Sequence, residues 1–332
     1  MFKLDDKQIG LLKAAGSMNE TEAHAAQAEL TKGLAEEFYQ EGILDGDIVS
    51  GIFVSETFDE DVVSEYILDL VAPGTEADLI AWYMPDTGWV PERTINMNKV
   101  NVPRKNVANS INCPLKFLRQ KRVDILGRMM DAMEAGFIIR DNLDGWSVIL
   151  AAGAGNGAAV EASGTDGVFD FASLRAMKLR MRRQDNGNST SVGRRIMTDL
   201  FLSPEAAEDI RELAHDDADD FTRKEIADRA DMDGFRWQGV NFNVLDELGD
   251  GQLFQKYWIE TLGIAMVDSS TELLIGLDLT PRGKRNFVNP KGMNLEIYED
   301  RNLHRRQEFG WYSWKSRGYA VLNRRVIVIG NA

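Results

Sequence analysis

The sequence is poor in the residues that build redox and metal centres. Of its 332 residues, one is a cysteine, Cys113, and three are histidines. A single cysteine excludes an intramolecular disulfide and any zinc or iron–sulfur site with several thiolate ligands. The histidines His24, His215 and His304 are scattered along the chain, which disfavours a metal site built mainly from imidazole. We therefore expect neither metal nor cofactor, and a protein made in a reducing cytosol.

Long apolar runs are also missing. No apolar stretch reaches about 18 residues, so the sequence predicts no transmembrane helix and no membrane partner. The first residues, Met1 to Asp6, lack the basic and then apolar order of a signal peptide. Hydrophobic residues make up 44% and charged residues 27% of the chain, which are ordinary values for a globular protein.

Positive charge is scarce at the start of the chain. Residues 1–92 carry 20 Asp and Glu against 4 Lys and Arg, a net charge of −16, while the whole chain carries −15. An acidic chain is a poor candidate for tight binding to nucleic acid phosphates. Basic residues gather later, over 104–128, 175–195 and 281–325. Separated acidic and basic regions favour head-to-tail pairing between copies, with a solvated surface as the alternative for each region.

The first third of the chain predicts a helical segment and then a long hairpin. Residues 5–41 favour a helix, in which Leu30, Leu34 and Phe38 recur at four-residue spacing. Residues 72–107 are punctuated by proline and glycine. Two strands are predicted between the turns, over 79–83 and 96–102. We expect this proline-rich hairpin to protrude.

Residues 115–150 give the strongest helix signal. Its apolar stripe is spaced by three and four residues and consists of Val123, Leu126, Met130, Met133 and Phe137. A helix of about thirty residues would span roughly 45 Å. The glycine-rich residues 151–168 that follow are predicted to form a linker.

A mixed region and a β-rich tail complete the chain. Helices are predicted over 171–183 and from Pro204 onward, where Ser203 is the N-cap and proline occupies the first helical position. Strands are predicted over 195–202, 237–245, 272–279, 294–299, 311–314, 317–322 and 326–329.

The candidate ligand sites in the sequence are weak. Gly153–Gly157 lacks the Gly-Lys-Ser/Thr end of a phosphate loop and follows a predicted helix, which favours a linker. The acidic runs Asp216–Asp220 and Asp228–Asp233 lack the spacing of a calcium loop, which favours a solvated acidic surface. No Gly-x-Ser-x-Gly elbow and no evident Cys–His pair is present. A catalytic role is therefore not expected.

The order of these predicted elements is itself informative. It resembles the major capsid proteins of tailed bacteriophages with the Hong Kong 97-type fold. Two stretches carry the resemblance. Residues 107–126 look like the strand and charged turn that enter the spine helix of that family, and residues 309–330 look like its terminal strands. The resemblance implies an α+β fold.

The resemblance also implies a division into named parts. These are an N-terminal arm with an amphipathic helix over 1–65, an extended loop over 66–106, a peripheral domain with the spine helix over 107–165, an axial domain over 166–287, peripheral return strands over 288–317, and a terminal axial strand over 318–332.

The function that follows from the resemblance is assembly. The chain is expected to form hexamers and pentamers of an icosahedral shell that encloses phage double-stranded DNA without sequence-specific binding. Its expected partners are further copies of itself, scaffold and portal proteins, and an optional decoration protein. It would be assembled in the host cytoplasm and reside in the virion capsid. The alternatives are an encapsulin-like compartment of the same fold and a soluble nucleotide- or metal-dependent enzyme.

Contacts between copies are predicted on the hairpin and at the entry to the long helix. Aromatic residues dominate interface energetics, so the hairpin residues Trp82, Tyr83 and Trp89 are candidate anchors, with packing inside the hairpin base as the alternative. Basic residues at the helix entry are expected to meet acidic residues of a neighbouring arm. The basic candidates are Arg119, Lys121 and Arg122, and the acidic candidates are Glu36, Glu37 and Glu41.

Overall fold

The computed structural model divides the chain into two compact units. It describes residues 48–59, 62–67, 99–119, 123–155, 169, 171–183, 195–217, 235–249, 252, 273–292, 296–300, 303 and 306–331. The first unit comprises Met1–Ser64, Asn101–Gly145 and Val288–Tyr319. The second comprises Glu65–Val100, Trp146–Phe287 and Ala320–Ala332. Each unit is therefore assembled from separated segments of the sequence, while the finer domain boundaries given above remain predictions.

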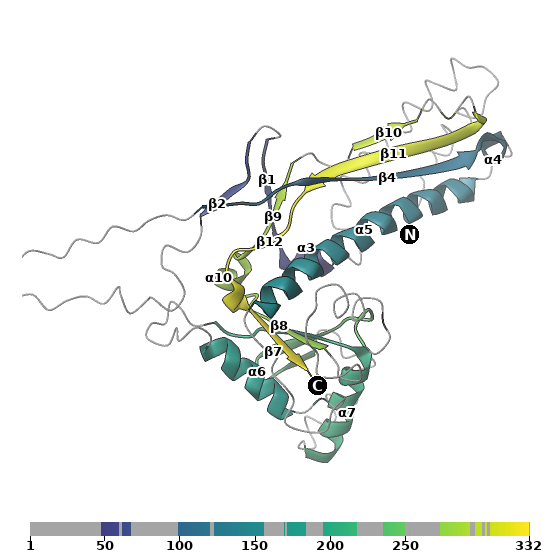
Figure 1. Ribbon diagram of the computed structural model, residues 1–332. Helices are drawn as coiled ribbons and strands as arrows, with labels where there is room; N and C mark the ends of the chain where they lie inside the picture. Colours follow the sequence, from purple (N-terminus) through teal and green to yellow (C-terminus); the bar gives the residue numbers. More distant parts are fainter. Residues whose placement is uncertain are drawn as a thin grey trace, which may run out of the picture. The chain divides into compact units, whose positions relative to one another are not determined.

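The first unit is built around the long strand β11 (Glu308–Arg317). It pairs antiparallel with β4 (Lys105–Pro114) over ten residues, from Glu308 opposite Pro114 to Arg317 opposite Lys105. Its other edge pairs with the shorter strand β10 (Glu296–Glu299). The same sheet contains β9 (Phe287–Lys291), which pairs in parallel with β1 (Val54–Thr57). Figure 1 shows β10, β11 and β4 side by side.

The helix α5 (Val123–Ala154) packs one face against this sheet. Met133 and Phe137 of the predicted stripe are buried. The backbone carbonyl of Met133 accepts a hydrogen bond of 3.0 Å from Nδ2 of Asn109 on β4. Gly136 permits the close approach, because a Cβ there would lie 2.6 Å from Asn109 Nδ2. The predicted long helix is confirmed, although it is preceded by a separate short helix, α4 (Leu115–Arg119).

A short helix, α3 (Ile48–Ile52), packs against α5 in this unit. Its residues Val49 and Ile52 are buried. Val49 lies against Gly145 of α5, where any larger side chain would collide with it. The ring of Phe53 then meets the edge of Tyr319 at 5.0 Å between centroids.

The second unit holds a sheet of order β13-β8-β5-β7-β6. Its strands are β5 (Asp199–Leu202), β6 (Phe235–Trp237), β7 (Val240–Val244), β8 (Leu273–Leu277) and β13 (Ile327–Asn331). Only β5 and β7 run parallel among these pairs. Other described elements of this unit include α6 (Phe171–Arg183), α7 (Pro204–Asp217), α10 (Pro281–Lys284), β12 (Ala320–Val321) and a 3-10 turn over Arg324–Val326.

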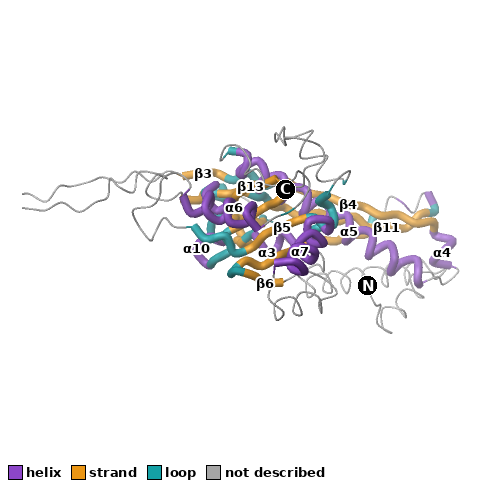
Figure 2. Tube along the Cα trace, turned by 90° about the horizontal axis from the view of Figure 1, so that it is seen from below, coloured by secondary structure: helices purple, strands orange, loops and turns teal. Residues whose placement is uncertain are grey.

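The core of the second unit lies between its helices and this sheet. Leu174 and Met177 of α6 are fully buried. The helix approaches β13 closely, because a Cβ at Gly330 would lie 2.7 Å from the sulfur of Met177. Figure 2 shows α6 beside β13 from a second direction. From the later part of α5, Trp146 packs edge-on against Phe201 of β5 at 4.9 Å between centroids.

A small two-stranded sheet lies at the base of the predicted hairpin. It pairs β2 (Glu65–Ile67) with β3 (Lys99–Asn101). The predicted strand over 96–102 therefore contains β3, while the predicted strand over 79–83 and the predicted helix over 5–41 lie outside the described residues.

Several predicted boundaries were wrong for identifiable reasons. The predicted strand over 237–245 is two strands joined by a turn at Gln238 and Gly239, whose φ angles of 48° and 81° suit a tight hairpin. Residues 195–198 precede β5 without regular structure, although their pattern resembles a strand. The run over 317–322 is also interrupted, since β11 ends at Arg317 and β12 begins at Ala320.

Two further outcomes concern helix ends. The predicted N-cap of α7 is confirmed, because Ser203 Oγ accepts a hydrogen bond of 3.1 Å from the backbone N–H of Ala206. The predicted linker begins too early, since α5 continues through Ala154. Gly153 is buried there, and a Cβ at this position would lie 2.5 Å from Ile329 Cδ1. The glycine thus allows close packing between the helix and β13.

Candidate interaction surfaces

The exposed face of the β10–β11 pair carries three aromatic side chains, which we call the aromatic surface: Tyr298, Tyr312 and Trp314. Successive side chains of a strand point to opposite faces. Because Trp311 and Ser313 of β11 are buried, Tyr312 and Trp314 lie on the other face. The ring of Tyr298 stacks on Tyr312 at 5.5 Å and meets Trp314 edge-on at 5.7 Å. Tyr298 and Trp314 remain 40% and 39% exposed.

Small side chains border the aromatic surface. The register of β4 places Ala108 opposite Trp314 and Ser110 opposite Tyr312. Because Ala108 and Ser110 are small, they leave one side of the Tyr312 and Trp314 rings uncovered. An exposed cluster of Tyr and Trp on a flat sheet face is typical of a contact surface, since these residues are enriched at protein interfaces.

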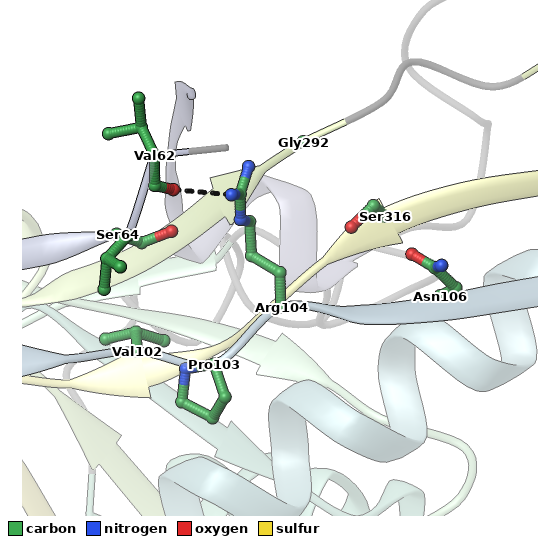
Figure 3. Close-up of a pocket in the computed structure, with 9 residues that line it drawn as sticks. Val62, Ser64, Val102, Pro103, Arg104, Asn106, Gly292 and Ser316 are labelled. Carbon is green, nitrogen blue, oxygen red and sulfur yellow. Dashed lines mark hydrogen bonds between the residues drawn. The ribbon is translucent and has the colours of Figure 1, made fainter. Parts of the chain in front are cut away.

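A second surface lies where the chain enters and leaves the hairpin region. A pocket of about 440 Å³ is lined there by nine residues: Val62, Val63, Ser64, Val102, Pro103, Arg104, Asn106, Gly292 and Ser316. Figure 3 shows the Arg104 side chain reaching the carbonyl of Val62. The guanidinium donates to the carbonyls of Val62, Asp59 and Phe58, at 2.6, 3.0 and 3.1 Å. Arg104 therefore holds the backbone at Phe58, Asp59 and Val62. The Val62 and Val63 side chains are about half exposed.

The two strands at the base of the hairpin are joined by an exposed ion pair. Lys99 Nζ lies 2.9 Å from a carboxylate oxygen of Glu65. Both side chains are about half exposed, so this pair contributes at most about 1 kcal/mol to stability.

A buried charge cluster ties α5 to β11 within the first unit. Asp141 of α5 lies 2.7 Å from Lys315 Nζ and also forms an ion pair with Arg317. Lys315 and Arg317 are two residues apart, so both point to the helix side of β11. The ammonium of Lys315 lies 4.9 Å from the ring centre of Phe137, and the guanidinium of Arg317 lies 5.4 Å from that of Tyr319. This cluster sets the position of the helix beneath the sheet.

The contact residues predicted from the sequence remain predictions. Trp82, Tyr83, Trp89, Glu36, Glu37, Glu41, Lys121 and Arg122 all lie outside the described residues. Arg119 is the last residue of α4. The described part of the chain therefore does not test these predicted contacts between copies.

The candidate ligand sites have a structural explanation where they are described. Gly153 belongs to α5 and packs against β13, and the carbonyl of Gly155 accepts a hydrogen bond of 2.8 Å from Arg324. This is a capped helix C-terminus, which does not attract a phosphate. Asp216 and Asp217 end α7, and the rest of both acidic runs lies outside the described residues.

Neither metal ligands nor a membrane helix is found among the described residues. No three His, Cys, Asp or Glu side chains gather there closely enough to hold a metal ion. No described helix is both long and apolar enough to cross a membrane. The single cysteine, Cys113, lies buried on β4, and this burial raises the pKa of its thiol above the ordinary value of 9.0.

Sequence reasoning missed the aromatic surface and the buried charge cluster. The first was within reach, because a period of two through β11 separates Tyr312 and Trp314 from Trp311. The second was not, because Asp141 and Lys315 are 174 residues apart and the strand register decides that they meet.

Comparison with known proteins identifies the fold. No family model matches the sequence, and no curated protein is similar enough to count as a relative. A solved chain of Microbacterium phage Oxtober96 superposes with a TM-score of 0.54 at 11% identity, covering 86% of this chain and 90% of the other. The mature capsid of bacteriophage PhiM1 gives 0.52 at 9% identity, with 85% and 86% covered. The capsid of the native GTA particle gives 0.52 at 12% identity, with 86% and 90% covered.

At these identities the likeness establishes the fold. It extends over most of each chain, so the match concerns the whole arrangement of elements and not one shared motif. The α+β class expected from the sequence is confirmed. The chain has the Hong Kong 97-type fold found in the capsid proteins of tailed bacteriophages.

Proposed function

We propose that this protein is a major capsid protein, which assembles as hexamers and pentamers into an icosahedral shell that encloses phage double-stranded DNA. The observation that carries the proposal is the likeness to the PhiM1 mature capsid and to the GTA particle capsid over 85% and 86% of this chain. Those chains are subunits of assembled capsids by description. A chain with the same fold is best explained as a subunit of the same kind.

The exposed surfaces of the chain support the proposal that it is a subunit that assembles. Two large side chains of the aromatic surface, Tyr298 and Trp314, are about 40% exposed, and burying them against another copy would be energetically favourable. The net charge of −15 disfavours tight binding to DNA phosphates. Such a shell would enclose DNA without gripping it.

The remaining parts of the proposal follow from the fold family. The N-terminal arm and the extended loop would lie over neighbouring copies, with Trp82 and Trp89 among the anchors. Scaffold, portal and decoration proteins would be its partners. The protein would be assembled in the host cytoplasm and would reside in the virion.

A double variant tests the role of the aromatic surface in assembly. Tyr298→Ser combined with Trp314→Ser removes two exposed rings from the folded subunit. Aromatic residues that act as interface hot spots cost about 2 kcal/mol or more each when truncated, so loss of both rings should raise the assembly threshold at least about a hundredfold in concentration. Sedimentation velocity across a concentration series measures that threshold.

The matched control is Ile139→Ser, which removes a side chain that is 61% exposed on α5 of the same unit. The control should assemble like the wild-type chain. Circular dichroism of the unassembled subunits should be identical for all three proteins. An unchanged threshold in the aromatic double variant would show that this surface is not a contact between copies.

A further inference from the structure

The outward side of α6 forms a basic groove in the second unit. Seven residues line it and define it: Arg175, Lys178, Leu179, Arg182, Arg195, Ile196 and Met197. Its volume is about 390 Å³. Four of the seven residues are cationic, and none carries a carboxylate. Like charges gathered in one groove repel each other, so an anionic occupant would stabilise it.

The helix presents this groove because its two sides differ in character. Leu174, Met177 and Met181 are buried against the sheet. Arg175, Leu179 and Arg182 follow the spacing i, i+4 and i+7, so they lie in one line on the other side. Cations in the last turn of α6 are also favoured by the helix dipole. The groove is thus a stable feature of the folded chain.

The groove combines its charge with exposed apolar area. Leu179 is 48% exposed and Ile196 is 58% exposed. Lys178 is held in place by a hydrogen bond of 2.8 Å from its Nζ to the carbonyl of Gln238. A nucleic acid backbone would neutralise the cations and leave both apolar side chains in water. An acidic peptide with an apolar stripe would neutralise the cations and cover the apolar side chains as well.

The chain itself contains a segment of this composition. Residues 20–41 carry six glutamates and one lysine: Glu20, Glu22, Glu29, Lys32, Glu36, Glu37 and Glu41. Leu30, Leu34 and Phe38 recur at four-residue spacing, which predicts one apolar stripe on a helix. This acidic segment lies outside the described residues, so its match to the groove rests on its sequence alone.

We propose that the basic groove binds the acidic segment 20–41 of a second copy of this chain. The inference rests on the proposed function, since assembly brings the copies together. Each copy carries one groove and one acidic segment, so head-to-tail pairing occupies every groove in a closed ring. The glutamates would pair with Arg175 and Arg182, in place of the basic residues at the helix entry that were predicted from the sequence as their partners. The apolar stripe would cover Leu179 and Ile196.

Site-directed disulfide formation between two chains tests this contact. One chain carries Leu34→Cys and the other carries Leu179→Cys, and the two are mixed under assembly conditions and oxidised. The native Cys113 is buried, so it contributes little background. Mass spectrometry of the digest should detect a peptide that joins positions 34 and 179. Isotope labelling of one chain shows whether the link joins two copies.

Charge reversal identifies the groove as the cause of the link. Adding Arg175→Glu and Arg182→Glu to the Leu179→Cys chain should lower the yield of the linked peptide at least about tenfold. Adding Glu36→Arg and Glu37→Arg to the Leu34→Cys chain should restore much of it. The matched control is Arg180→Glu with Arg183→Glu, on the same helix but outside the groove lining, which should leave the yield near that of the parent pair.

The contrary outcomes are distinct. If the disulfide joins positions 34 and 179 only within one chain, the groove does not bind a second copy. If charge reversal in the groove leaves the yield of the linked peptide unchanged, the groove is not the binding site. The same conclusion follows if charge reversal lowers only the DNA content of the particles. Shells that form without any link overturn this inference and leave the proposed function standing. A wild-type chain that forms no oligomer overturns the proposed function itself.

Discussion

The buried charge of Asp141 should contribute strongly to the stability of the subunit. Its side chain is 6% exposed and forms ion pairs with Lys315, which is 17% exposed, and with Arg317, which is 4% exposed. Asp141→Asn keeps the size of the side chain and removes its charge. Two cations then remain beside a neutral group inside the unit. Removal of one partner from a buried ion pair costs about 3–5 kcal/mol, because the other charge is left uncompensated.

A second acidic residue on the same helix provides the control. Asp144 pairs with Arg140 at 2.9 Å, four residues away, but the two side chains are 31% and 52% exposed. A pair of this kind contributes about 0.3–0.5 kcal/mol. Asp144→Asn therefore makes the same chemical change, three positions further along α5, at a fraction of the cost.

Urea unfolding of the unassembled subunit, followed by tryptophan fluorescence, measures both variants. We expect Asp141→Asn to lower the free energy of unfolding by several kcal/mol and Asp144→Asn to lower it by less than about 1 kcal/mol. A triple variant with Asp141→Leu, Lys315→Met and Arg317→Met should recover most of the loss, because it removes all three charges together. Equal effects of the two Asn variants would refute the reasoning that burial makes the Asp141 cluster important.

Three further predictions concern single positions. The Cys113 thiol should react with a thiol reagent at least about tenfold more slowly in the native chain than in urea. Burial raises the pKa of the Cys113 thiol above 9.0 in the folded chain, so the neutral thiol contributes fully to stability below pH 9.0. That contribution is lost as the pH rises through the folded pKa. The free energy of unfolding of Cys113→Ala should therefore depend less on alkaline pH than that of the wild-type chain. Gly153→Val should cost about 1–3 kcal/mol in urea unfolding, because a Cβ there would lie 2.5 Å from Ile329 Cδ1, and an unchanged stability would favour a loop over the observed helix. Ser203→Ala should lower the free energy of unfolding by about 1 kcal/mol, as measured by thermal unfolding, because it removes the 3.1 Å cap to the N–H of Ala206.

The sequence predicted the elements whose information is local. The apolar stripe with Met133 and Phe137 identified α5, because a helix places every third or fourth residue on one side. The Ser203-Pro204 pair located the start of α7, because capping depends on residues only three apart. The order of such elements along the chain was enough to indicate the fold.

The features that the sequence could not predict depend on distant partners. Gly153 was assigned to a linker because glycine is common in linkers, whereas its role depends on the proximity of Ile329 from the far end of the chain. The turn at Gln238 and Gly239 was missed because Trp237, Val240, Phe242 and Val244 were predicted to lie in one strand, although Gly239 signals a turn. Asp141 gave no signal of its own, since an isolated acidic residue on a helix normally faces water.

The central claim is that this chain is the subunit of a closed shell. Negative-stain electron microscopy of the purified protein, together with size-exclusion chromatography, tests it most directly. The account predicts closed shells, or rings of five and six copies, at concentrations where the protein is stable, with or without an added scaffold protein. A single particle near 37.2 kDa, unchanged by protein concentration, salt or an added scaffold protein, would contradict the account.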